Sequence, residues 1–167
     1  PTTNRVEIYE RDREIREVEW DITREVDGED GRVKRVARVI LHILEDPQPG
    51  ERYYLNVDPS KGIDSPEHDP GGILVRKEST GEEVALYEGY IGSYGLGSLA
   101  AGLGKQYNMA VVDPESNSGW SEGVMRALGD VSYGNIARTY KTGHGGKLEP
   151  RFGFETTTDD REGRRTR

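Results

Sequence analysis

The chain has 167 residues, of which 32% are hydrophobic and 32% are charged, and its formal net charge is −8 at pH 7. It contains 22 glycines and no cysteine, which excludes a disulfide framework, thiolate catalysis and cysteine-based zinc sites. This length fits one domain with a modest core, and the sequence lacks both an apolar run of membrane-spanning length and a secretory signal pattern. We therefore expect a soluble, intracellular protein with no membrane partner.

The first predicted element is an amphipathic helix within residues 4–31, where apolar side chains recur at spacings of three and four: Ile15, Val18, Ile22 and Val26. The segment Asp27–Gly31 ends this helix. We assign residues 1–36 to an N-terminal helical extension or linker. Residues 37–167 form the main predicted domain.

Strands follow the predicted helix. A β-branched run, RVARVILHILEDP, is closed by a turn at DPQPG, and three further apolar runs come next at short intervals: YYLNV, ILVRKE and VALYEGYI. Consecutive strands joined by short loops pair antiparallel, so these three runs predict a meander.

The period of the sequence then changes. The segment GSYGLGSLAAGLGKQYN predicts a helix that ends near Gly104, MAVVDPE predicts a strand, and SGWSEGVMRALGD predicts a second helix. Beyond Tyr133 the pattern dissolves into Gly, Thr and Arg. This order is typical of an α/β protein with a mixed sheet, and we expect five strands flanked by helices.

Two acids occupy the ends of predicted strands. Asp58 ends the first strand of the meander, and Glu115 follows the strand after the first glycine-rich helix. If these two strands lie parallel and adjacent, their carboxylates approach, and a shared proton or a divalent cation must relieve the repulsion. A pair of metal ions bridged by carboxylates is an arrangement that hydrolyses phosphodiesters by in-line attack of water. The alternative is that Asp58 caps the turn at Pro59 and Glu115 caps the helix beginning near Ser118.

The residues around these acids resemble a known family. The matching stretches are PQPGERYYLNVDPSKGIDSPEHDPGGILVRKESTGEEVALYEGYI, LGKQYNMAVVDPESNSGW, YGNIARTY and GFETTT. In this order they resemble the C-terminal nuclease domain of the tailed-phage terminase large subunit, over residues 40–158.

The resemblance implies a ribonuclease H-like fold and a two-metal-ion endonuclease that uses Mg²⁺ or Mn²⁺ to cut concatemeric double-stranded viral DNA during genome packaging. It places Asp58 as the first catalytic aspartate and Glu115 as the acid on the fourth strand. Asp69 matches an aspartate that assists at the metal. Asn117 and Gly119 match a segment that shapes the turn behind the glutamate.

The same resemblance implies several partners: double-stranded DNA, an upstream ATPase domain, the portal and the small terminase subunit, in the cytoplasm of an infected bacterium. The basic residues Lys141, Lys147 and Arg151 are candidates for contacts with the DNA backbone, with a solvated tail as the alternative. No phosphate-binding Gly-x-x-x-x-Gly-Lys-Ser/Thr motif occurs, so packaging-motor activity is excluded for this chain.

One departure from the family concerns its third metal-binding carboxylate, which lies further along the chain. The pair Asp159 and Asp160 comes too early to match it, so we expect a chain truncated before the third acid. Two alternatives remain open at this point. One is a non-catalytic module of the same fold that binds DNA or a portal, and the other is a different ribonuclease H-like nuclease, such as a resolvase.

Overall fold

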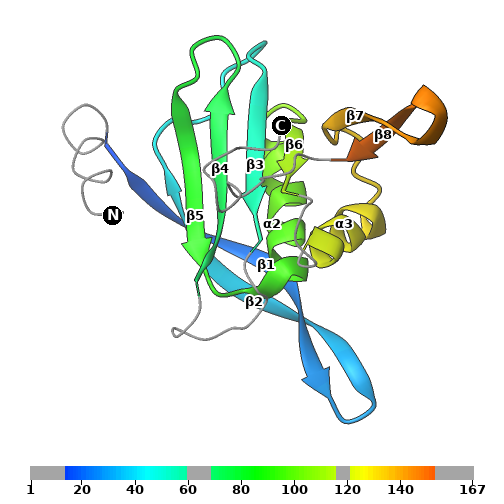
Figure 1. The fold of residues 1–167 in the computed structure, drawn as a ribbon. Helices are drawn as coiled ribbons and strands as arrows, with labels where there is room; N and C mark the ends of the chain where they lie inside the picture. Colours follow the sequence, from blue (N-terminus) through cyan, green and yellow to red (C-terminus); the bar gives the residue numbers. More distant parts are fainter. Residues whose placement is uncertain (1–13, 60–68, 116–120, 153–167) are drawn as a thin grey trace, which may run out of the picture.

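The structure is a computed structural model that describes residues 14–59, 69–115 and 121–152. In chain order its elements are β1 (Arg16–Gly28), β2 (Gly31–Ile43), β3 (Tyr53–Asp58), β4 (Gly71–Lys77), β5 (Glu83–Gly89), α2 (Gly92–Gln106), β6 (Val111–Pro114), α3 (Ser121–Asp130), β7 (Arg138–Thr142), a short 3₁₀ turn (His144–Gly146) and β8 (Leu148–Phe152) (Figure 1). No helix in these three ranges is long and apolar enough to cross a membrane.

Six strands form one mixed sheet in the order β1-β2-β5-β4-β3-β6. The strands β3, β4 and β5 make the predicted antiparallel meander, and β6 pairs parallel to β3 after the crossover through α2. The α/β class and the predicted ribonuclease H-like arrangement, a meander whose first strand lies beside a parallel fourth strand, are therefore confirmed. The sheet has six strands rather than five.

The additional strand corrects the predicted N-terminal helix. Residues 16–28 form β1, which pairs antiparallel with β2 along its whole length, from Arg16 opposite Ile43 to Gly28 opposite Gly31. The segment Asp27–Gly31 is the turn of this hairpin, and Gly31 has a φ of 114° that a side chain would disfavour. A helix is therefore wrong for residues 16–28. The division at residue 36, which falls inside β2, stays a prediction.

The core lies between the sheet and α2. Alternate residues of β3 point into it and are fully buried, because the side chains of a strand alternate between its two faces: Tyr53, Leu55 and Val57. The leucines of α2 meet them from the other side: Leu96, Leu99 and Leu103. Each such side chain contributes about 1.5–3 kcal/mol through burial.

The second helix, α3, packs on α2 at close range. A Cβ atom added to Gly97 of α2 would lie 2.5 Å from the carbonyl oxygen of Val124 and 2.7 Å from Cβ of Ala127. Gly97 therefore permits the close packing of α3, and Gly95 lies instead against Ile22 of β1.

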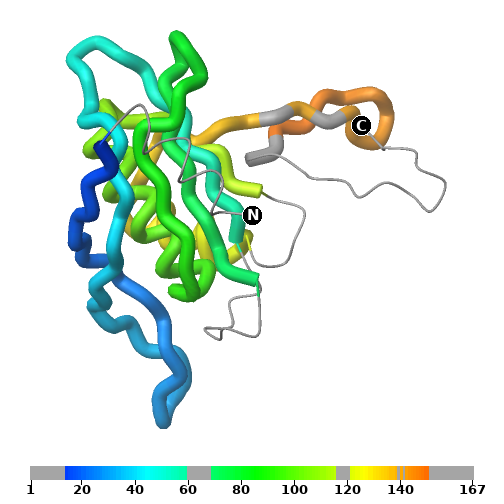
Figure 2. Tube along the Cα trace, turned by 90° about the vertical axis from the view of Figure 1, so that its left-hand side faces the viewer, coloured from blue at the N-terminus to red at the C-terminus, as the bar shows by residue number. Residues whose placement is uncertain are grey.

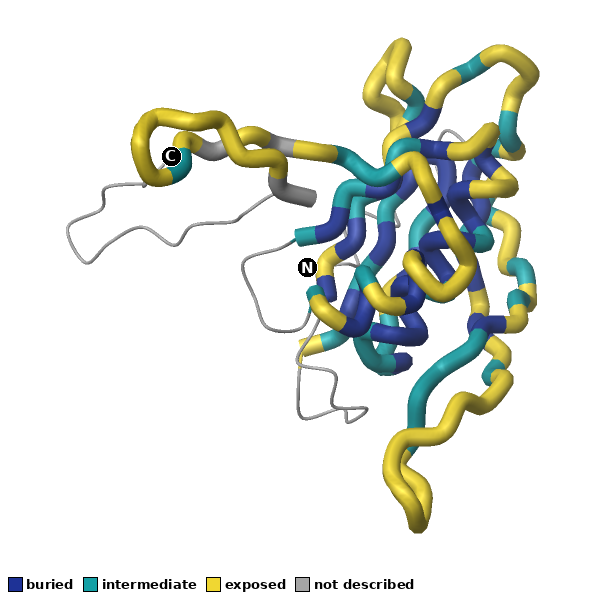
Figure 3. The backbone as a smooth tube through the Cα atoms, turned by 90° about the vertical axis from the view of Figure 1, so that its right-hand side faces the viewer, coloured by how far each residue is buried: buried dark blue, intermediate teal, exposed yellow. Residues whose placement is uncertain are grey.

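Two hairpins extend from this body. The tip of β1–β2 projects from one end, and β7–β8 runs away from the body on another side (Figure 2). Figure 3 shows that the buried residues gather in the sheet and the helices, whereas both hairpin ends are exposed. The β7–β8 hairpin was not predicted. The hairpin follows a parallel bridge between Ile136 and Val112 of β6. At this bridge the chain runs in the same direction as β6.

Candidate metal-binding site at the ends of two parallel strands

The parallel pairing of β3 and β6 places two acids side by side. Val57 is opposite Pro114, and the backbone N–H of Glu115 donates to the carbonyl oxygen of Val57 at 2.9 Å. Asp58 and Glu115 are the next residues on their strands. Since Val57 and Pro114 face the buried side, Asp58 and Glu115 both face the opposite side of the sheet, away from α2.

The electrostatics agree with this approach. Partial burial, a hydrogen bond to Glu115 and the charge of Glu115 together raise the pKa of Asp58 from its ordinary value of 3.8 to about 6. The Asp58 residue keeps contact with solvent, so the approach of Glu115 is the firmer of these causes. A carboxyl pair of this kind either shares a proton or holds a cation.

Asp69 lies just before β4 and is exposed. Its charge also raises the pKa of Asp58, so the two carboxylates lie within range of electrostatic interaction. Across the parts of the chain that the structure describes, however, no three His, Cys, Asp or Glu side chains gather closely enough to form a metal site. The two carboxylates that approach each other are therefore those of Asp58 and Glu115, and Asp69 is a more distant neighbour.

A pair of carboxylates fits a magnesium-like cation. Mg²⁺ commonly binds to a protein through one or two carboxylates, and water and substrate phosphate oxygens supply the other ligands. Asp58 and Glu115 provide such a pair with oxygen donors only, at an edge that is open to solvent. A second cation would need further oxygen ligands, and Asp69 is the acid that was predicted to assist there.

Sequence reasoning missed another acid next to this pair. Asp113 precedes Glu115 by two residues and therefore shares its face of β6, opposite Asn56 of β3. One of its carboxylate oxygens, Oδ1, is buried and has no hydrogen-bond partner among the described residues, and burial raises the pKa of Asp113. The alternation of VVDPE was the available signal, because it puts Asp113 and Glu115 on one face.

The remaining predicted site residues are distributed as follows. The three basic residues lie in the β7–β8 hairpin, where the backbone of Lys141 pairs with Glu149 and that of Arg151 with Thr139, while Lys147 is exposed before β8. This hairpin forms a two-stranded sheet that is separate from the sheet of the carboxylate pair. The family positions Asn117 and Gly119 lie outside the described residues, as do Asp159 and Asp160.

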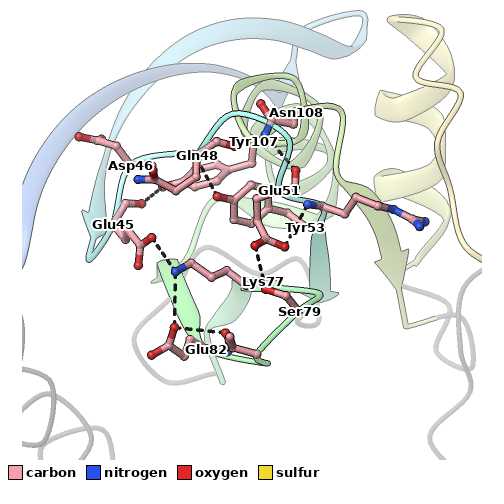
Figure 4. A network of polar contacts seen from close by, with 12 residues as sticks. Glu45, Asp46, Gln48, Glu51, Tyr53, Lys77, Ser79, Glu82, Tyr107 and Asn108 are labelled. Carbon is pink, nitrogen blue, oxygen red and sulfur yellow. Dashed lines mark hydrogen bonds and ion pairs between the residues drawn. The ribbon is translucent and has the colours of Figure 1, made fainter.

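A second polar cluster occupies the opposite end of β3 (Figure 4). Lys77 lies 2.6 Å from Glu45 and 3.4 Å from Glu82, and the Tyr107 hydroxyl donates to the carbonyl oxygen of Glu45 at 2.8 Å. The rings of Tyr53 and Tyr107 pack edge to face, 5.1 Å apart. The polar groups of this cluster are paired with each other, which stabilises the start of β3. The candidate site is therefore the other end of β3, where Asp58 and Glu115 lie.

Comparisons with known proteins add one similarity. No family model and no curated protein matches the sequence. Among solved structures, the fold is similar to that of the large terminase nuclease from thermophilic phage G20c, crystallised with bound magnesium. The TM-score is 0.48 and the identity 14%, over 67% of this chain and 77% of that chain. At this identity the likeness concerns the backbone, and the chemistry of the site depends on the side chains described above.

Proposed function

We propose that this chain is a divalent-metal-dependent nuclease that hydrolyses phosphodiester bonds of double-stranded DNA. The observation that carries this proposal is the convergence of Asp58 and Glu115 at the ends of two adjacent parallel strands. Two carboxylates held close together on one face repel each other by themselves and are stabilised by a cation between them. Phosphodiester hydrolysis by a nuclease is one reaction that uses such a cation beside a phosphate.

The residues of the chain would act chiefly by holding and orienting. When bound, Mg²⁺ or Mn²⁺ supplies a positive charge for the phosphate oxygens and a means of activating water. Asp58 and Glu115 would hold the ion from one side of the sheet, and the 2.9 Å backbone bond between their strands fixes their spacing. Asp69 would complete a two-ion site by approaching the pair. No protein nucleophile is required.

We further propose that the substrate is concatemeric viral DNA, which is cut during genome packaging in the cytoplasm of an infected bacterium. This finer proposal is supported by the resemblance of residues 40–158 to terminase nuclease domains. The same resemblance implies three partners: an ATPase domain, a portal and a small terminase subunit.

A plasmid-nicking assay tests the nuclease proposal. Supercoiled DNA incubated with Mn²⁺ should be nicked by the native chain, and Asp58→Asn or Glu115→Gln should lower the rate at least about 100-fold by removing an ion ligand. Asp30→Asn, in the exposed turn between β1 and β2, is the matched control and should nick at the native rate. If Asp58→Asn is folded and nicks as fast as the control, the carboxylate pair is not catalytic.

The absence of a three-ligand group in the described residues favours one competitor, the non-catalytic module. In that case the native chain would bind duplex DNA but leave it intact at every Mg²⁺ and Mn²⁺ concentration. A resolvase-like relative would instead cut branched DNA in preference to plain duplex, so a four-way junction belongs in the same assay.

A further inference from the structure

A pocket of about 310 Å³ lies near the carboxylate pair, on the same face of the sheet. It opens between β2 and β5, which pair only through His42 with Leu86 and Ile43 with Ala85. Beyond these pairs β2 diverges from β5 towards the tip of the β1–β2 hairpin (Figure 1). The pocket occupies the angle between the two strands.

The register of the sheet connects this pocket to the pair. Gly72 of β4 is opposite Glu88 on one side and opposite Asp58 on the other. Glu88, which lines the pocket, therefore lies in one row with Asp58 and on the same face, two strand spacings or about 10 Å away. Because Gly72 has no side chain, nothing rises from β4 between them. Pro70, another lining residue, directly follows Asp69.

The lining has a mixed chemistry. His42 and Tyr90 offer flat rings, and Ile40 and Leu86 offer apolar contact. Glu88 is exposed and provides a carboxylate, which accepts hydrogen bonds and repels phosphate. The volume is at the small end of ligand pockets. These properties fit a base and its sugar better than a phosphate group, since bases stack on rings and their amino groups donate to carboxylates.

We propose that this pocket binds the nucleoside next to the phosphate held at Asp58 and Glu115, and that Glu88 favours a base with an exocyclic amino group, such as cytosine. This inference rests on the proposed nuclease function for its biological meaning. A neighbouring nucleoside turned out of the base stack would reach the pocket over Gly72, the position of β4 that has no side chain. The preference would then bias where the strand is cut.

Binding of a single nucleoside to the metal-free chain tests the inference, because a nucleoside carries no phosphate for the carboxylates to repel. Deoxycytidine is titrated while the methyl NMR signals of Ile40 and Leu86 are followed, with thymidine as the comparison. We expect both methyl signals to shift with deoxycytidine and tighter binding of deoxycytidine than of thymidine. Glu88→Met should weaken cytosine binding about tenfold, the effect of losing one hydrogen bond to a charged group.

Two further variants sharpen the result. Glu29→Met makes the same substitution in the exposed β1–β2 turn and should bind like the native chain. Ile40→Trp, at a side chain that is 46% exposed, should block the pocket without disturbing the core. Methyl signals that do not move up to the solubility limit of the nucleoside, or equal binding of both nucleosides by the native chain, overturn the inference.

The outcomes separate this inference from the nuclease proposal. If deoxycytidine binds and Asp58→Asn still nicks DNA at the native rate, the nuclease proposal fails and the nucleoside pocket stands. If Asp58→Asn is inactive and neither nucleoside binds, the pocket proposal fails alone.

Discussion

At the scale of single residues, the protonation of Asp58 makes the stability of the fold depend on pH. Its pKa of about 6 exceeds the ordinary value of 3.8, so the folded chain binds this proton more tightly than the unfolded chain does. Stability from this group is therefore present at low pH and is lost as the pH rises between about 4 and 6. Two pKa units correspond to at most about 3 kcal/mol, and solvent contact reduces this to about 1 kcal/mol.

The first prediction follows from the loss of stability when Asp58 ionises. In metal-free buffer at pH 7, Asp58→Asn should raise the melting temperature by about 2–4 °C, because it removes the repulsion from Glu115. Its stability should also vary less between pH 4 and 6 than that of the native chain. Thermal melts in the presence of a chelator measure both effects. A variant that melts below the native chain at pH 7 would show that the carboxylates do not repel each other.

Some of the candidate site could be predicted from sequence. Asp58 and Glu115 each end an apolar run, and strand ends meet when the strands are parallel and adjacent. Asp113 could have been added by the same reasoning, because the alternation in VVDPE puts it on the face of Glu115. Glu88 could not, because its position depends on which residue faces which across β3, β4 and β5, and a register is set by packing rather than by local sequence.

At the scale of elements, β1 shows how a helix prediction fails. Val18, Ile22 and Val26 are four residues apart, a spacing that fits one face of a helix and also one face of a strand. Trp20 lies between them and packs on the same core from β1, which only the strand period allows. The β7–β8 hairpin was missed for another reason. Tyr140 is 64% exposed and Leu148 is 68% exposed, so no buried face marks its sequence.

The second prediction tests whether β1 is part of the core. Ile22 is 3% exposed, and Ile22→Ala should lower the free energy of unfolding by about 2–4 kcal/mol because it leaves a cavity beside α2. Val36, which is 76% exposed on the neighbouring strand, supplies the control: Val36→Ala should cost less than about 1 kcal/mol. Urea denaturation gives both values. Equal and small effects would make residues 16–28 a dispensable extension.

The third prediction concerns the contact between α2 and α3. Gly97→Ala forces a methyl group to within 2.5 Å of a backbone oxygen of α3, so it should destabilise the fold by about 2–3 kcal/mol. Gly129→Ala makes the same change on α3 with no neighbouring atom within 4 Å, and better helix propensity should stabilise the chain by about 0.5 kcal/mol. Denaturant midpoints should therefore move in opposite directions. A stabilising Gly97→Ala would contradict the close packing.

At the scale of the whole molecule, charge is divided between an acidic body and a basic hairpin. The chain carries −8 overall, whereas residues 138–152 contain four basic side chains and one acidic one. Because duplex DNA repels the body, we expect binding to depend on this projecting hairpin. At Ile136, shortly before the hairpin, the chain runs parallel to β6. It therefore runs towards the end of β6 at which Glu115 lies.

The fourth prediction measures that dependence. The double variant Lys141→Gln and Lys147→Gln should weaken binding to duplex DNA of any sequence and lower the slope of log affinity against log salt by about 0.9 per lost phosphate contact. Fluorescence anisotropy at several salt concentrations gives the slope. Replacing both Arg35 in β2 and Lys105 at the end of α2 by Gln is the control of equal charge change, because both residues are exposed on the body. An equal loss in both variants would mean that only net charge matters.

The convergence of Asp58 and Glu115 on one divalent cation is tested most directly by calorimetric titration of Mn²⁺ into the metal-free chain. The native chain and Asp30→Asn should each show a stoichiometric site. Asp58→Asn and Glu115→Gln should each lose about 10–100-fold in affinity at that site. A native chain that binds no Mn²⁺, or four proteins with the same isotherm, would contradict the convergence.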